Sequence, residues 1–508
     1  MLKICKELFD LWNKDSVKYC HWKSNEHLLE GLVGLTDLDI YVHYDDKTTA
    51  EEHLEKCGYI KFVPQKGARY PFVDEWIGFD YETGKLIHIH LHYKIITGTK
   101  YNKEYVFPLD DLIVSTRILN EEFNVYVASP DIEIIVLYSR IALKAKDKER
   151  IKVDSDYEKE ITYLKERVNY EQVKSYCEFF FKDAGEKMYQ FICKESLSFD
   201  EFNELYKIVD AWLKEYKKFS SFIVKIRYHF FKYRNLKNAV FNKYFKQHNI
   251  TRKTLPIRGL SLCFIGADGS GKSTVSIEIC KWLNWKVEGS RFYLGSGDHY
   301  NSLLKRVLSK ASSKIASKKA QENDKIAKND EAVKVSTAPK KKSLLKGILK
   351  SGFIYLQSVY LKKIATRSYA ELKKAKKYAE KGAIAILDRF PQNQFAGIYD
   401  GPKIAARYPT AKNPFVVLNA KSEEKAIVKS QKYQPDVVFK LLLPPEESVR
   451  RKPDHTIEEV SAKAEITPKL VFENSIVYDI DATKPYDEEL LEIKRLIWKV
   501  IKDNGNRI

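Results

Sequence analysis

A glycine-rich segment in the middle of this chain limits its possible folds more than any other feature. Residues 261–265 form an apolar run that predicts a buried strand, and a helical pattern begins at Val275. The nine residues between them match the pattern GxxxxGK[ST], which in a strand–loop–helix context predicts a phosphate-binding P-loop. These residues are Gly266, Ala267, Asp268, Gly269, Ser270, Gly271, Lys272, Ser273 and Thr274.

The physical reason for this prediction is that glycines let the backbone curl around an anion. Successive N–H groups then point inward at a phosphate, and the following helix adds the partial positive charge of its N-terminus. Lys272 is expected to reach the β- and γ-phosphates, and the Ser273 hydroxyl to hold Mg²⁺. ATP and Mg²⁺ are therefore the expected cofactors.

The region around the loop has the pattern of an α/β domain. Five short apolar runs are separated by helical stretches, which predicts a parallel sheet flanked by helices on both faces. The runs lie at residues 261–265, 291–294, 383–387, 437–443 and 477–480.

Charged residues follow two of these runs. Asp388 stands at the end of the strand predicted at 383–387, where a carboxylate beside a P-loop can hold Mg²⁺, and Arg389 next to it suits an acceptor phosphate. Arg450 and Arg451 follow the run at 437–443 and are predicted to lie in a lid that stabilises charge during phosphoryl transfer.

The P-loop, the pair Asp388-Arg389 and the basic lid segment together resemble the thymidylate kinase family of P-loop nucleoside monophosphate kinases, over residues 260–502. The resemblance implies phosphoryl transfer from ATP to a phosphorylated acceptor, with Asp268 contacting the acceptor sugar. It also implies that the arginines which stabilise the transferred phosphate lie in the lid segment, here Arg450 and Arg451, and not in the P-loop. The family's Ser-x-x-Ala-Tyr-Gln stretch is missing after Arg389, which leaves the acceptor open.

Three alternatives remain for the function. Asp400-Gly401-Pro402 resembles a branch of thymidylate kinase-like proteins associated with bacterial surface polysaccharides, which suggests a kinase for a sugar phosphate. The P-loop domain could instead be an ATP-gated binding module with negligible turnover. It could also regulate a nucleotidyltransferase located in the N-terminal half.

The N-terminal residues 1–125 predict an α+β domain. Asp37 and Asp39 alternate along a predicted strand after Gly34, so both carboxylates share one face and can hold divalent metal ions. This arrangement resembles the nucleotidyltransferase fold, in which a neighbouring strand supplies a third carboxylate. Here the hairpin strand that follows carries His88, His90 and His92 on one face, with His90 at the position of that carboxylate. The histidines could form a metal site or only a polar sheet face.

Residues 126–250 are expected to be a helical connector. Within it, residues 223–244 form a basic amphipathic helix, which could pack against a domain or lie on an anionic membrane surface. A second basic stretch, at 300–350, predicts a flexible insert in the P-loop domain. Its lysines have no interleaved aromatic residues, so a nucleic-acid partner is not expected. The expected partner is a nucleotide or a phosphorylated small molecule.

The remaining sequence features favour a cytoplasmic protein. The seven cysteines are scattered without a paired spacing, which fits reduced thiols. Charged residues follow the first Met too closely for a signal peptide, and no apolar run is long enough for a membrane-spanning helix.

Overall fold

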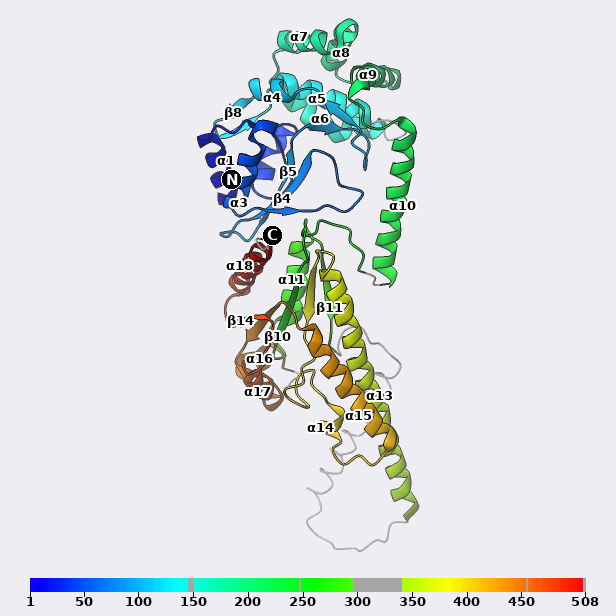
Figure 1. The fold of residues 1–508 in the computed structure, drawn as a ribbon. Helices are drawn as coiled ribbons and strands as arrows, with labels where there is room; N and C mark the ends of the chain where they lie inside the picture. The colour runs from blue at the N-terminus through cyan, green and yellow to red at the C-terminus, as the bar shows by residue number, and fades with distance from the viewer. Residues whose placement is uncertain (145–149, 246–247, 296–339, 454–455, 506–508) are drawn as a thin grey trace. The chain divides into compact units, whose positions relative to one another are not determined.

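The computed structural model describes residues 1–144, 150–245, 248–295, 340–453 and 456–505 (Figure 1). The chain forms two compact units. The first consists of Met1–Pro256 together with Lys494–Ile508, and the second of Ile257–Ile493. The first unit therefore contains both the α+β part and the helical part that the sequence pattern separates.

The first unit is built on a mixed sheet of seven strands in the order β3-β4-β5-β2-β1-β9-β8. The predicted strand around Asp39 and the predicted hairpin are both confirmed, as β2 and as the antiparallel pair β4 and β5. The strands are β1 (Tyr19–His21), β2 (Leu38–Val42), β3 (Ile60–Phe62), β4 (Val73–Phe79), β5 (Leu86–His92), β8 (Ile118–Asn120) and β9 (Val125–Val127), and a separate pair is formed by β6 (Ile95–Thr97) and β7 (Tyr105–Phe107).

Alternate residues of β2 point to opposite faces of this sheet and enter two different cores. Ile40 packs with Phe9 and Trp12 of α1 (Lys3–Lys14) and with Leu54 of α3 (Lys47–Lys56). Tyr41 packs on the other face with the long apolar helix α5 (Pro130–Lys144). The sheet is thus covered on both faces, and polar side chains of β2, β4 and β5 lie together near the start of β2. Two short helices complete this part, α2 (Leu28–Leu32) and α4 (Asp110–Ser115).

The helical part of the first unit packs around α5. It contains α6 (Arg150–Lys165), α7 (Tyr170–Phe181), α8 (Gly185–Cys193), α9 (Phe199–Trp212) and α10 (Ser221–Phe245). The predicted basic helix is confirmed as α10. Val224 is buried and Phe231 lies against the loop at Gly67, while Phe230 and Tyr233 are exposed. A membrane surface as the partner of these exposed side chains stays a prediction.

The second unit contains a fully parallel five-stranded sheet in the order β11-β12-β10-β13-β14, as the sequence predicts. The strands are β10 (Ser261–Gly266), β11 (Gly289–Tyr293), β12 (Ile384–Asp388), β13 (Val437–Leu442) and β14 (Ile476–Asp481). The chain passes from β10 to β11 and β12 on one side of β10 and then crosses to β13 and β14 on the other side, so the C-terminal end of β10 lies at the switch point where ligands bind in open α/β sheets.

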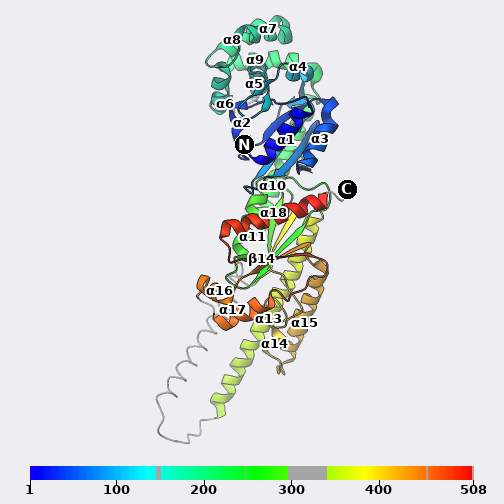
Figure 2. The ribbon, with the colours of Figure 1, turned by 90° about the vertical axis from the view of Figure 1, so that its left-hand side faces the viewer.

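Helices cover both faces of this sheet (Figures 1 and 2). Of two consecutive residues in β11, Arg291 contacts Ser276 of α11 (Lys272–Leu283), whereas Phe292 contacts Tyr378 of α13 (Lys340–Ala379). These two helices therefore lie on opposite faces. The other helices of the unit are α14 (Ile404–Arg407), α15 (Pro414–Ser430), α16 (Pro445–Arg451) and α17 (Ile457–Ile466), and α18 (Tyr486–Gly505) begins there.

The basic insert predicted at 300–350 lies mostly outside the described residues, which resume at residue 340. From Lys340 onward the chain is helical as α13, so the irregular segment was predicted too far toward the C-terminus. Further along the same helix, Leu361 packs with Ile404 and Val416, on α14 and α15.

The residues of the C-terminal helix are divided between the two units. Residues of α18 from Lys494 on belong to the first unit, where Trp498 stacks on Phe62 and Phe79 at ring-centroid distances of 6.5 and 5.8 Å. The seven cysteines are free thiols. Among the described helices, none combines the length and the apolar character required to span a membrane.

Candidate active site

The P-loop has the backbone conformation that phosphate binding needs. It connects the buried strand β10 to α11, whose first residue is Lys272. Gly269 and Gly271 adopt φ angles of +87° and +84°, which glycine tolerates better than any other residue. A Cβ at Gly266 would lie 2.7 Å from the Leu441 carbonyl oxygen, so β13 and the loop approach closely only because this residue is glycine.

Lys272 is held at the mouth of the loop. Its side chain is buried, and Nζ donates a hydrogen bond of 2.5 Å to the Ala267 carbonyl oxygen. Burial, together with the positive charge of Arg389, lowers the pKa of Lys272 to about 7. A buried ammonium group bonded to its own loop can exchange that carbonyl for the oxygens of an anion.

Asp388 lies at the end of β12, directly beside β10, and is fully buried. Its Oδ2 atom accepts a 2.9 Å hydrogen bond from Ser273 Oγ and one of 3.4 Å from Ser276 Oγ, and it forms an ion pair with Arg291. Its Oδ1 atom has no hydrogen-bond partner within the described part of the chain. A buried, unpartnered carboxylate oxygen next to the P-loop serine fits the ligand set of Mg²⁺.

Arg389 occupies a strained position at the same sheet edge. Its φ angle of +76° is unusual for a residue with a side chain and is typical of functional sites. The guanidinium lies 3.4 Å from Asp268 Oδ1 and 3.9 Å from Asp400 Oδ2. Burial opposes the charge, but the carboxylates of Asp400 and Asp268 outweigh it and raise the pKa of Arg389. A permanently charged arginine between two acids can exchange them for a phosphate.

A lysine that the sequence pattern does not mark completes this network. Lys463 on α17 forms an ion pair with Asp268. Burial opposes the Asp268 charge, but Lys463 and the nearby cations lower the pKa of this carboxyl. One lysine among the 88 Lys and Arg residues of the chain has no distinctive spacing, so only its position in the fold identifies it.

In the structure, the two predicted lid arginines contact residues outside the P-loop. Arg450 is 78% exposed and forms a 2.7 Å ion pair with Glu447. Arg451 also pairs with Glu447, at 2.9 Å, and donates to the Ala482 carbonyl oxygen. The contact between this segment and the loop is made instead by Ser448, whose hydroxyl donates to the Asp268 carbonyl oxygen.

A cavity of about 690 Å³ adjoins the loop at Ala267. It is lined by the ends of β13 and β14 and by α17, and its volume lies in the range of small-ligand pockets. Its lining includes the charged residues Asp479 and Asp481 and the hydroxyl-bearing residue Thr483. The cavity is therefore large enough for the nucleoside part of a nucleotide.

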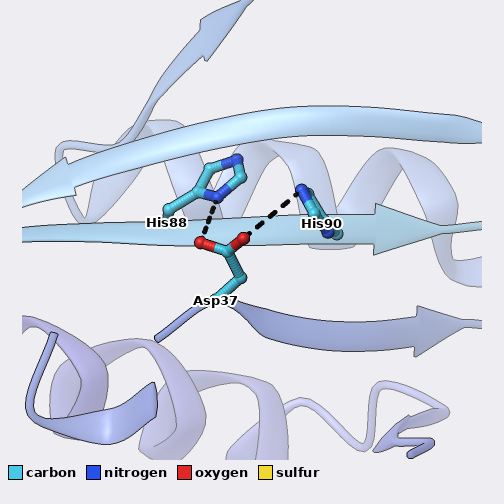
Figure 3. A group of neighbouring side chains, drawn as sticks. All are labelled: Asp37, His88 and His90. Carbon is cyan, nitrogen blue, oxygen red and sulfur yellow. Dashed lines mark hydrogen bonds and ion pairs between the residues drawn. The ribbon is translucent and has the colours of Figure 1, made fainter. Parts of the chain in front are cut away.

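The first unit brings together the other predicted metal ligands. Asp39 of β2 lies directly opposite His90 of β5, which in turn lies opposite Glu75 of β4. Asp37 immediately precedes β2 and contacts His88 (Figure 3). Glu75 was not identified from the sequence. Its position opposite His90 follows from the hairpin formed by β4 and β5, because residues at equal distances from a hairpin turn face each other. His90 and Glu75 form a 3.2 Å ion pair.

Two carboxylates of this cluster, Asp39 and Glu75, have lowered pKa values. Burial opposes ionisation of Asp39, but Lys23 at 2.9 Å and two histidines lower its pKa well below the usual value. The pKa of Glu75 is lowered in the same way by His90 and His88. Burial alone would keep His90 neutral, yet Glu75 and Asp39 raise its pKa to about 9. The cluster thus holds negative charge that a cation stabilises.

Comparison with known proteins relates about half of the chain to ATP-binding proteins. No model of a known protein family matches the chain. The uncharacterized ATP-binding protein YghR of Escherichia coli strain K12 is 27% identical over 248 residues, covering 46% of this chain and 86% of that protein. The uncharacterized ATP-binding protein YghS of the same strain is 27% identical over 247 residues, covering 48% and 93%.

Solved structures of a deoxyadenosine kinase from M. mycoides also align with the chain. The form with bound dATP covers 47% of this chain and 99% of its own, with 14% identity and a TM-score of 0.27. The form with bound dCTP has 13% identity and the same TM-score of 0.27.

Proposed function

We propose that the second unit is an ATP-dependent phosphotransferase of the nucleoside monophosphate kinase type. The observation that carries the proposal is the 2.9 Å hydrogen bond between Ser273 and Asp388 at the end of the P-loop, with Asp388 Oδ1 unpartnered among the described residues. A P-loop hydroxyl and a strand-end carboxylate together form the usual Mg²⁺ site of P-loop enzymes. The names of the two Escherichia coli relatives support ATP as the nucleotide.

The residues of the site have distinct tasks in this reaction. Backbone N–H groups from Gly266 to Thr274 surround the β-phosphate, and Lys272 transfers its hydrogen bond from Ala267 to the β- and γ-phosphates. Ser273 and Asp388 hold Mg²⁺, which neutralises phosphate charge. Catalysis then consists mostly of positioning and charge stabilisation.

Arg389 is the residue proposed to bind the phosphate of the acceptor. Its guanidinium lies beside both Asp268 and Asp400, and the parallel N–H groups of the guanidinium can donate to two phosphate oxygens. Asp268 would accept a hydrogen bond from the acceptor sugar, as the resemblance to thymidylate kinases implies. Lys463 approaches the same carboxylate from α17 and supplies the cation that the lid requires.

The acceptor is the part of this proposal that an experiment must decide. A screen with radiolabelled ATP would offer nucleoside monophosphates and sugar phosphates to the wild type and to the Lys272→Ala variant. Labelling of thymidylate or another nucleoside monophosphate supports the proposal. Labelling of sugar phosphates alone rejects it in favour of the polysaccharide alternative, and ATP binding without transfer to either class indicates a binding module.

For the first unit we propose a nucleotidyltransferase-like fold. The register that places Asp39 opposite His90 on a parallel neighbouring strand supports it, because that fold needs an acidic strand beside the Asp-x-Asp strand. Release of pyrophosphate from nucleoside triphosphates measures the activity. If Asp37→Ala abolishes pyrophosphate release and Lys272→Ala does not, the first unit is a nucleotidyltransferase. If the wild type releases no pyrophosphate, the first unit shares the fold of nucleotidyltransferases but not their activity.

A further inference from the structure

Two histidines of β5 and one carboxylate converge at the start of the neighbouring interior strand β2 in the first unit (Figure 3). Asp37 Oδ1 lies 2.7 Å from His88 Nδ1, and Asp37 Oδ2 lies 3.9 Å from His90 Nε2. Donor atoms from all three residues lie within 4.8 Å of one another. The three side chains come from β5 and from the residue before β2, so sheet pairing fixes their mutual positions.

These separations match the spacing of ligands around one metal ion. Two ligand atoms that are each about 2.1 Å from a tetrahedral ion lie about 3.4 Å apart. The distances of 2.7 and 3.9 Å that Asp37 makes to the two histidines lie on either side of this value. The two histidine nitrogens lie within 4.8 Å of each other, so small side-chain shifts would bring all three ligand atoms to one ion.

The remaining nitrogen of each histidine already contacts a different carboxylate. His88 Nε2 lies 2.6 Å from Glu75 Oε2, and His90 Nδ1 lies 3.3 Å from Asp39 Oδ1. Metal-binding histidines typically donate their other N–H group to a carboxylate, which fixes the tautomer and the orientation of the ring. Both histidines of this cluster have that arrangement, and Glu75 Oε2 also lies 3.2 Å from His90 Nε2, next to the proposed ligand atom.

We propose that Asp37, His88 and His90 bind one divalent transition-metal ion, through the Asp37 carboxylate, His88 Nδ1 and His90 Nε2, with Glu75 and Asp39 as positioning residues. Imidazole nitrogens favour ions from Mn²⁺ to Zn²⁺, whereas Mg²⁺ prefers oxygen ligands and keeps its water. The site therefore differs from a pair of carboxylates that share Mg²⁺. It is independent of the kinase proposal, because all five residues belong to the first unit.

The site is also accessible to a further ligand. Asp37 and His90 are 28% and 27% exposed, whereas His88 is fully buried. A metal ion bound at the three residues would thus have coordination positions open to solvent, as catalytic sites do. Those positions suit a water molecule or a phosphate oxygen.

Metal titration of the full-length chain tests the proposal. The protein is first treated with a chelator, and Zn²⁺ binding is then followed by calorimetry and Co²⁺ binding by its visible d–d absorption. We expect one ion of either metal per chain, with Mg²⁺ unable to displace it at a hundredfold excess. Asp37→Asn and His90→Gln should each weaken binding at least about 100-fold, and Asp39→Asn about 10- to 100-fold.

The matched control is His27→Gln, a substitution of the same kind at a half-exposed histidine that contacts Glu26 and Glu30 outside the cluster. Near-ultraviolet circular dichroism establishes that each variant is folded. Absence of Zn²⁺ and Co²⁺ binding to folded wild type would overturn the proposal. Binding that Asp37→Asn and His90→Gln weaken no more than His27→Gln, or Mg²⁺ binding as tight as that of Zn²⁺, would also overturn it.

Discussion

The P-loop and the carboxylate–histidine cluster are both proposed to bind charged ligands at the ends of sheet strands, but by different physical means. In the P-loop the binding groups are main-chain N–H groups of consecutive residues, and Gly269 and Gly271 set their directions. In the cluster the binding groups are side chains from different strands, which meet because Asp39, His90 and Glu75 are in register. A one-residue slip of β5 would turn both histidines of the site to the other face.

This difference means that the P-loop depends on local sequence, whereas the cluster depends on the tertiary structure of its sheet. A backbone site tolerates changes elsewhere but fails when its lysine or its glycines change. A side-chain site fails gradually as each ligand or positioning residue is removed. The two sites lie in separate compact units, so substitutions in one should leave ligand binding at the other unchanged.

The largest effect is expected from Lys272→Ala. Removal of the buried ammonium group deprives the transferred phosphoryl group of its nearest cation, so turnover should fall about 100- to 1000-fold. Zn²⁺ stoichiometry should not change. Lys281→Ala is the matched control, because Lys281 lies on the same helix but is exposed and pairs with Glu278. Equal losses in the two variants, or loss of Zn²⁺ binding in Lys272→Ala, would break the comparison.

A smaller and more selective effect is expected from Arg389→Ala. Charge-assisted hydrogen bonds to the acceptor are lost, so acceptor-dependent turnover should fall about 10- to 100-fold, while ATP binding should change less than about threefold. The left-handed backbone is equally strained with Ala, so the loop should keep its conformation. Steady-state kinetics with varied acceptor measure the change, with Arg407→Ala as control. An equal loss of ATP affinity would contradict the assignment of Arg389 to the acceptor.

The two candidate cations of the lid can be compared directly. Lys463→Ala should lower turnover about tenfold, because Lys463 pairs with Asp268 beside the loop. Arg450→Ala should have less than about a threefold effect, because Arg450 is exposed and pairs with Glu447. The reverse order of effects would show that the lid arginines move to the phosphates when nucleotide binds, as the sequence pattern predicts.

The pH dependence of ATP binding should follow from the pKa of Lys272, which is about 7 in the free protein. Phosphates stabilise the protonated amine and raise its pKa, so binding above pH 7 takes up a proton. Affinity should then fall as the pH rises, by at most about tenfold per pH unit. Calorimetry at pH 8 in two buffers with different ionisation enthalpies measures this uptake. The absence of any buffer dependence in the wild type would contradict it.

The sequence predicted the local features of both units. Each of the five expected strands of the second unit is present, because buried parallel strands appear as apolar runs, and the P-loop follows β10 as its motif requires. The alternation of Asp37 and Asp39 likewise predicted their common face. These features depend on residues close to one another in the chain.

Features that depend on distant residues could not be predicted in the same way. Lys463 reaches Asp268 only because α17 folds back over the P-loop, a contact across 195 positions. Trp498, near the end of the chain, stacks on Phe62 in the first unit, and no periodicity in α18 indicates that partner. Arg450 and Arg451 have the expected composition of a lid, yet the acid that pairs with them is Glu447, one turn earlier on their own helix.

The most direct test of the central claim is a calorimetric titration of the folded, full-length chain with Mg·ATP. We predict saturable heat with one site per chain in the wild type and in His90→Gln, and none in Lys272→Ala. The absence of saturable heat in the wild type, or unchanged binding in Lys272→Ala, would contradict the account of the P-loop as the nucleotide site.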